Sequence, residues 1–104
     1  MIKNCTPHKI SVYVDDTMFE FPSCGIIPRC EQREYIIGEI DNIKITKQFF
    51  GDVTDLPEQE DGVYLIVSRL VAVACPNRSD LLVPGPLIRD EEGKVVGCNG
   101  LSKI

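Results

Sequence analysis

A run of five apolar residues, VYLIV at 63–67, constrains the fold of this chain more than any other stretch. Gly62 bounds the run on its N-terminal side, and no polar residue interrupts it. A continuous apolar run of this length is typical of a strand that is buried on both faces, whereas a half-buried strand would alternate. The sequence therefore predicts a doubly buried strand at Val63–Val67.

The segment that follows, RLVAVAC at 69–75, has two interpretations. Ser68 can cap the N-terminus of a helix and Pro76 can stop one, which favours a short helix. The valines of the segment would instead suit a continuation of the strand. We expect the short helix.

Two β-hairpins are predicted from alternation and turn residues. In residues 8–21, a strand of alternating side chains meets turn residues at 15–17 and then returns. Near the C-terminus, residues 87–89 and 94–96 flank the turn DEEG at 90–93, which places a glycine at a left-handed position.

The middle of the chain carries weaker signals. Residues 26–35 form a charged strand with Pro28 near its start, which suits the edge of a sheet. Residues 42–50 form a further strand, which we expect to end at Gly51. One face of that strand is apolar and consists of Ile43, Ile45 and Phe49.

These elements predict one small mostly-β domain over residues 1–104: an antiparallel β-sheet or a partly open barrel with one short helix. We expect residues 52–62 to form a solvated acidic loop and residues 101–104 to be a frayed tail. A chain of this size has a thin core, and forming a homo-oligomer would strengthen it.

Charge and hydropathy exclude several classes of function. The net charge of −5 and the pI of about 4.7 argue against non-specific binding to nucleic acid. The chain starts without the apolar segment of a signal peptide, and no apolar run approaches the ~20 residues of a membrane span. We therefore expect a cytoplasmic protein that does not contact a membrane.

The five cysteines are expected to be free. An odd number without a secretion signal argues against a disulfide framework, and no two form a CxxC pair. A zinc site built from some of them with His8 has no support from their spacing. We expect small buried hydrophobes, with no metal and no cofactor.

The known enzyme motifs are absent from the chain. It has no GxSxG, HExxH or GxxxxGK[ST], and His8 is its only histidine. A nucleophile–base pair of Cys98 with His8 is conceivable, but nothing in the sequence brings them together. At the entrance to a strand, a lone histidine is more often structural or exposed than catalytic. We predict a protein that is not an enzyme and has no catalytic residue.

Three arginines in the C-terminal half have two interpretations. Arg78 with Asp80, or Arg89 with Asp90, could tie loops together through charge-assisted hydrogen bonds. The guanidinium groups could instead bind phosphate oxygens while a tyrosine stacks on a base. For any single arginine we favour the structural interpretation. For the three arginines together, the choice between a structural role and a ligand site stays open. The candidate ligand-binding residues are Arg69, Arg78, Asp80, Arg89, His8 and Tyr64.

Several short motifs resemble those of a group of small proteins encoded in phage and prophage genomes. The resemblance covers most of the chain except residues 31–50, and it implies a phage origin and work in the cytoplasm of the infected bacterium. It transfers no mechanism. The motifs are Asn4-x-Thr6-Pro7-His8, Tyr64-x-Ile66-Val67-Ser68, Val71-Ala72, Arg78-x-Asp80-Leu81, Pro84-Gly85, Ile88-Arg89-Asp90, Gly93 and Gly97-Cys98.

Three functions remain open at this point, and a small hydrolase is a fourth option. The first is a phage accessory protein that counteracts host antiviral defence by sequestering a nucleotide-type signalling molecule, with pockets at the subunit interfaces of an oligomer. The second is an inhibitor that binds a host defence protein through an edge strand or an apolar patch. The third is a virion assembly protein.

Overall fold

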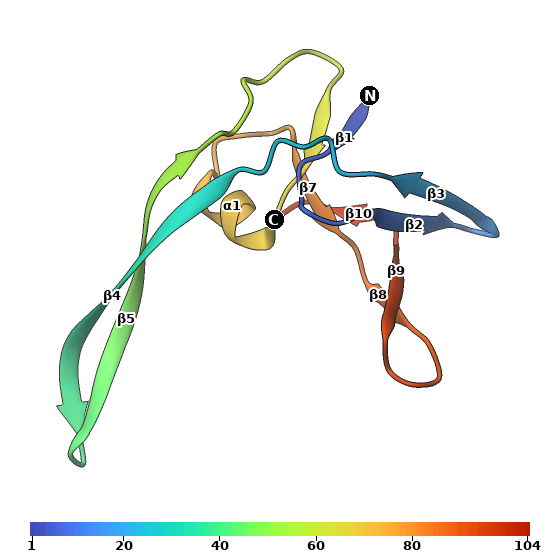
Figure 1. Cartoon of the computed structure of the whole chain (residues 1–104). Helices are drawn as coiled ribbons and strands as arrows, with labels where there is room; N and C mark the ends of the chain where they lie inside the picture. The colour runs from blue at the N-terminus through green and yellow to red at the C-terminus, as the bar shows by residue number, and fades with distance from the viewer.

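Strands dominate the structure, a computed structural model that describes all of residues 1–104. They form three separate sheets, none of which closes on itself, and one short helix accompanies them (Figure 1). This confirms the predicted mostly-β class with one helix. The elements are β1 (Ile2–Asn4), β2 (Ile10–Val14), β3 (Thr17–Phe21), β4 (Arg29–Ile40), β5 (Ile43–Thr54), β6 (Tyr64–Ile66), α1 (Arg69–Ala74), β7 (Leu81–Pro84), β8 (Leu87–Arg89), β9 (Val95–Asn99) and β10 (Leu101–Ser102).

The first sheet has the strand order β1-β6-β7-β10 and contains the core. Its β6 lies between two parallel neighbours, β1 and β7. Leu65, Ile66 and Val67 are fully buried, which confirms the predicted burial for this part of the run, whereas Tyr64 is 42% exposed. The apolar cluster of the core consists of Cys5, Leu65, Val67, Val71, Ala72, Leu81 and Val83.

Helix α1 forms where the sequence predicts it, in preference to a longer strand. The hydroxyl of Ser68 accepts a hydrogen bond from the backbone N–H of Val71 at 3.3 Å, so the predicted cap is present. The helix ends before Pro76, which has no N–H to continue the helical ladder. Val71 and Ala72 are buried in the core cluster.

The second sheet has the order β3-β2-β9-β8 and contains both predicted hairpins, β2–β3 and β8–β9. The two hairpins are joined by a parallel pairing between β2 and β9, which lie at opposite ends of the chain. Antiparallel pairing holds for the hairpins, as predicted, whereas β1–β6, β6–β7 and β2–β9 are parallel pairs that the prediction did not include.

The third sheet is a long hairpin of β4 and β5, called the arm below (residues 29–54). Its two strands pair only with each other, and it projects from the rest of the molecule (Figure 1). Asp41 and Asn42 form its turn with φ values of 50° and 67°, the backbone that a two-residue type I′ turn requires. Both strands extend further toward the C-terminus than the sequence predicts. Strand β4 begins at Arg29 and continues to Ile40, and β5 continues through Gly51 to Thr54.

The C-terminal residues are ordered by the core sheet. Leu101 and Ser102 form β10 and pair with Pro84 and Val83 of β7, so the prediction of a frayed tail is wrong for these two residues. The backbone N–H of Gly85 donates to the carbonyl of Gly100 at 3.0 Å and holds the two segments together. The only helix, α1, is six residues long, and no helix is long and apolar enough to cross a bilayer.

Candidate functional site

The N-terminal motif Asn4-x-Thr6-Pro7-His8 is a hydrogen-bonded brace around a buried amide. The Asn4 side chain is 2% exposed. Its Nδ2 donates to the carbonyls of His8 and Phe21, both at 2.8 Å, and its Oδ1 accepts from the N–H and hydroxyl of Thr6 at 3.0 and 2.6 Å. Each polar atom of Asn4 is therefore satisfied internally, and the motif ties β1 to the end of the first hairpin.

Arg78 and Asp80 form the second internal brace. The guanidinium donates to both carboxylate oxygens of Asp80, through Nε at 2.9 Å and Nη2 at 2.8 Å, and Nη2 also donates to the Pro57 carbonyl at 2.8 Å. Asp80 is only 3% exposed. Hydrogen bonding to Arg78 lowers the pKa of Asp80 below its usual value, and the same bonds raise the pKa of Arg78. The pair thus fastens the acidic loop to the start of β7.

The other candidate ligand residues lie apart from this brace. Arg89 donates to the Gly93 carbonyl at 2.9 Å within the β8–β9 turn, so the expected Arg89–Asp90 pairing is not formed. Arg69 is exposed at the first position of α1, and its side chain makes no hydrogen bond. His8 is also exposed, and only its backbone carbonyl is hydrogen-bonded. The predicted residues do not form one site.

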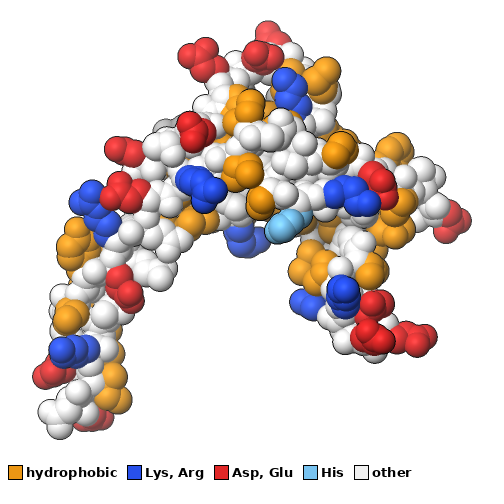
Figure 2. Space-filling view, viewed as in Figure 1, with side chains coloured by type: hydrophobic (Ala, Val, Ile, Leu, Met, Phe, Trp, Pro, Cys, Tyr) orange, Lys and Arg blue, Asp and Glu red, His pale blue; other side chains and the backbone are white.

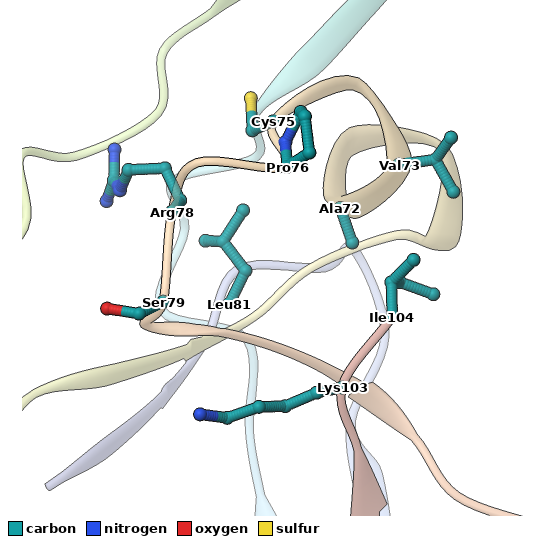
Figure 3. A pocket seen from close by; sticks show the side chains of 9 residues that line it. All are labelled: Ala72, Val73, Cys75, Pro76, Arg78, Ser79, Leu81, Lys103 and Ile104. Carbon is teal, nitrogen blue, oxygen red and sulfur yellow. The ribbon is translucent and has the colours of Figure 1, made fainter.

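A cavity of about 320 Å³ lies beside α1 and is called the α1 cavity below. Ala72, Leu81 and Ile104 face the hollow, and the side chains of Arg78, Ser79 and Lys103 extend to one side of it (Figure 3). Its volume falls within the range of roughly 300–1,000 Å³ that is typical of small-molecule sites. Apolar residues thus line one part of the cavity, and two cationic residues, Arg78 and Lys103, line another. A ligand with an apolar part and an anionic end would fit this arrangement.

A second hollow of about 210 Å³ adjoins the first and shares Ser79 and Lys103 with it. We call it the Tyr64 hollow, because Tyr64, 42% exposed, is the aromatic residue in its wall. The ammonium of Lys103 lies 6.0 Å from the centre of the Tyr64 ring, within the range of a cation–π contact. Three carboxylates, from Glu60, Asp61 and Asp80, belong to the polar part of this wall, together with Gln59, Ser79 and Lys103. Lys103 therefore stands at the junction of the two hollows.

Two of the five thiols lie close to each other, but all five cysteines are free. The sulfurs of Cys5 and Cys24 are 3.5 Å apart, and burial, with the hydrogen bond to Cys24 second, raises the pKa of Cys5 to about 11. The thiol of Cys98 donates to the Ser11 carbonyl at 3.6 Å, so it is not paired with His8. No three His, Cys, Asp or Glu side chains gather in a metal-binding arrangement.

Lys103 is the residue that sequence reasoning missed. It lies in the segment predicted to be frayed, and an isolated lysine near a chain end carries no motif. The pairing of β10 with β7 fixes its position beside Arg78 and Tyr64. Of the candidate ligand residues, the structure brings Arg78, Asp80 and Tyr64 to these two hollows and leaves the other three elsewhere.

No family model, no curated protein and no solved structure matches this chain. The chemistry of the two adjoining hollows is therefore the basis on which a function can be inferred.

Proposed function

We propose that the protein is a non-enzymatic binding protein that sequesters a small nucleotide-type ligand, with a phosphate held between Arg78 and Lys103. The observation that carries this proposal is that two cationic side chains, Arg78 and Lys103, line the same side of the α1 cavity (Figure 3). The Nε and Nη2 atoms of Arg78 are engaged by Asp80 and Pro57, and its Nη1 makes no hydrogen bond. That nitrogen remains available for a phosphate oxygen, which guanidinium groups bind well.

The Tyr64 hollow supplies the complementary half of such a site. Carboxylates such as Glu60 and Asp61 accept hydrogen bonds from the hydroxyls of a sugar or the amino group of a base. The Tyr64 ring offers a face on which a base could stack. In this arrangement Lys103 would bind the phosphate, and the Tyr64 hollow would hold the sugar hydroxyls and the base. A nucleotide has all of these groups, whereas a purely apolar molecule has none of them.

The absence of an acid–base pair favours binding over catalysis. The one imidazole, of His8, makes no hydrogen bond to a thiol or hydroxyl. Cys98 is buried and donates its thiol proton to a backbone carbonyl. A nucleophile normally needs a base within hydrogen-bonding distance, and neither hollow contains such a pair.

The resemblance to phage proteins supports a setting for this activity. In the cytoplasm of an infected bacterium, a protein that removes a nucleotide signal from solution would counteract an antiviral defence triggered by that signal. Sequestration needs only affinity and abundance, so no catalytic group is required.

Calorimetry and thermal shift with cyclic dinucleotides, cyclic trinucleotides and ADP-ribose derivatives test this proposal. We expect one class to raise the melting temperature and release heat, and Lys103→Gln to weaken its binding about 10-fold or more, since a charge-assisted hydrogen bond is lost. Lys94→Gln removes the same charge in the β8–β9 turn and should leave binding unchanged. No response from the wild-type protein to any of these nucleotides would contradict the proposal.

A second candidate function is inhibition of a host defence protein by direct binding. The observation that favours it is the row of exposed apolar side chains on the arm (Figure 2). A stoichiometric complex with one defined host protein, lost on substitution of the arm and retained in Lys103→Gln, would support this function.

A further inference from the structure

The arm is a long hairpin that the rest of its own chain leaves mostly uncovered. Each strand has 12 residues, which extends to about 40 Å at the usual rise per residue. Only its base is anchored, where Cys30 and Val53 pack against the core cluster. Beyond the base, Ile40 and Ile43 are 64% and 65% exposed. An isolated two-stranded hairpin is at best marginally stable in water, so this one needs a surface to pack on.

The register of β4 with β5 sorts the side chains of the arm onto two different faces. Cross-strand partners share a face, as in the pairs Tyr35–Lys47 and Arg33–Phe49. Tyr35 and Phe49 are diagonal neighbours on one face and make an edge-to-face contact, 5.5 Å between ring centres. One face, called the apolar face of the arm, carries Tyr35, Ile40, Ile43, Ile45 and Phe49, with the cations Arg33 and Lys47. Arg33 is ion-paired with the carboxylate of Glu31 at 2.7 Å, and Lys47 has no carboxylate partner. The opposite face carries Gln32, Glu34, Glu39, Lys44, Thr46 and Gln48, with Ile36 and Phe50. The arm is therefore amphipathic across its thickness.

The second sheet presents another apolar face, which is exposed at its two flanks. One row of partners crosses all four strands, in the order Phe19, Val12, Cys98 and Leu87. The two central residues are buried, whereas Phe19 and Leu87 at the flanks are 50% and 53% exposed. Acidic turns border this sheet, one at Asp15-Asp16 and the other at Asp90-Glu91-Glu92. Its apolar face thus has a negative rim, while the unpaired charge on the apolar face of the arm is the positive charge of Lys47.

The chain exposes more surface and is more extended than a compact monomer of its size. A compact monomer of 11.6 kDa would expose about 5,800 Å², and this chain exposes 7538 Å². Its radius of gyration is 16.7 Å, against about 13 Å for a compact domain of this length. The excess of about 1,700 Å² exceeds the roughly 800 Å² that each partner buries in a standard interface. The molecule therefore has enough surplus surface for a stable contact.

We propose that the chain self-associates, with the apolar face of one arm packed on the apolar face of the β3-β2-β9-β8 sheet of a second copy. This one contact covers both exposed apolar faces, whereas packing arm against arm would leave the sheet uncovered. It also places Arg33 and Lys47 near the acidic turns of the partner copy. The smallest closed assembly with this contact is a reciprocal two-fold dimer, and a ring of more copies uses the same contact. The proposal does not depend on a ligand.

Light scattering coupled to size-exclusion chromatography measures the mass of the wild-type protein directly. We expect at least twice 11.6 kDa at micromolar concentration. The variant Tyr35→Lys with Ile45→Lys should be monomeric. Its control, Ile36→Lys with Phe50→Lys, adds the same charges to the opposite face of the same strands and should remain associated. On the partner surface, Phe19→Lys should dissociate the assembly, and Met18→Lys, its neighbour on the other face, should not.

A monomeric wild-type protein would overturn the proposal, as would association that survives the first variant or is lost equally in its control. Association that survives Phe19→Lys would overturn the docking of the arm on the sheet. If the wild-type protein is monomeric but forms a complex with one defined host protein, the arm binds that protein and not a second copy of the chain. Should a variant fail to fold, the wild-type melting temperature decides, because that of an oligomer rises with protein concentration and that of a monomer does not.

Discussion

Arg78 holds Asp80 by two parallel hydrogen bonds, of 2.9 and 2.8 Å, while the carboxylate is almost fully buried. Removing one partner of such a pair leaves the other charge buried without compensation. We expect Arg78→Ala to lower the free energy of unfolding by about 3 kcal/mol. Arg78→Lys retains the charge but not the planar fork, and should lose less. Denaturant unfolding of the three proteins measures the difference, and equal stability of wild type and Arg78→Ala would refute the brace.

The same brace gives the protein an acid-sensitive stability. The folded pKa of Asp80 is lowered from its usual 3.8, so the unfolded state takes up the proton first as the pH falls. Its contribution to stability is therefore complete above pH ~4 and is lost as the pH drops through the folded pKa. Urea unfolding from pH 6 down to pH 2 should show this loss, and Asp80→Asn should show a shallower one. Parallel curves for the two proteins would show that another group is responsible.

Asn4 should be among the least replaceable polar residues of the chain. Its buried amide makes four hydrogen bonds, and Asn4→Ala would leave the carbonyls of His8 and Phe21 without their donor. We expect a loss of about 2–3 kcal/mol, since each unsatisfied buried group costs about 1–3 kcal/mol. Thr6→Ser keeps a hydroxyl at the same place and serves as the control. The prediction fails if thermal unfolding places Asn4→Ala within experimental error of Thr6→Ser.

The two neighbouring thiols should differ in reactivity. Cys5 is buried with its pKa raised to about 11, whereas Cys24 is exposed. A pKa two units above the usual value of 9.0 lowers the thiolate fraction near pH 8 about 100-fold. Iodoacetamide followed by peptide mass spectrometry should show alkylation of Cys24 well before Cys5 in the folded protein. In urea the two rates should converge, and equal rates in the folded state would contradict the burial of Cys5.

Local features of the fold were predictable, and long-range pairings were not. Ser68 and Pro76 delimit α1 as expected, and residues 65–67 of the apolar run are buried as expected, whereas Tyr64 is exposed. Alternation shows which residues share a face but not which strand lies beside them, so the parallel pairing of β2 with β9 was not foreseeable. The arm is different, because Asp41-Asn42 between two alternating strands is a recognisable two-residue turn.

The candidate site was only partly predictable for a similar reason. Arg78 and Asp80 are two residues apart, so a local brace between them could be anticipated from spacing. The convergence of Tyr64, Ser79 and Lys103 depends on how β6, β7 and β10 assemble, which no short motif records. Arg69, Arg89 and His8 are residue types that often bind ligands, but in this fold they lie away from the two hollows.

Equilibrium dialysis against the nucleotide extract of phage-infected bacteria, analysed by mass spectrometry, tests the central claim most directly. Three proteins are compared: wild type, Lys103→Gln and Lys94→Gln. The account predicts that wild type and Lys94→Gln enrich the same phosphate-bearing nucleotide and that Lys103→Gln does not. Enrichment of no nucleotide by the wild-type protein, or equal enrichment by all three, would contradict a nucleotide site between Arg78 and Lys103.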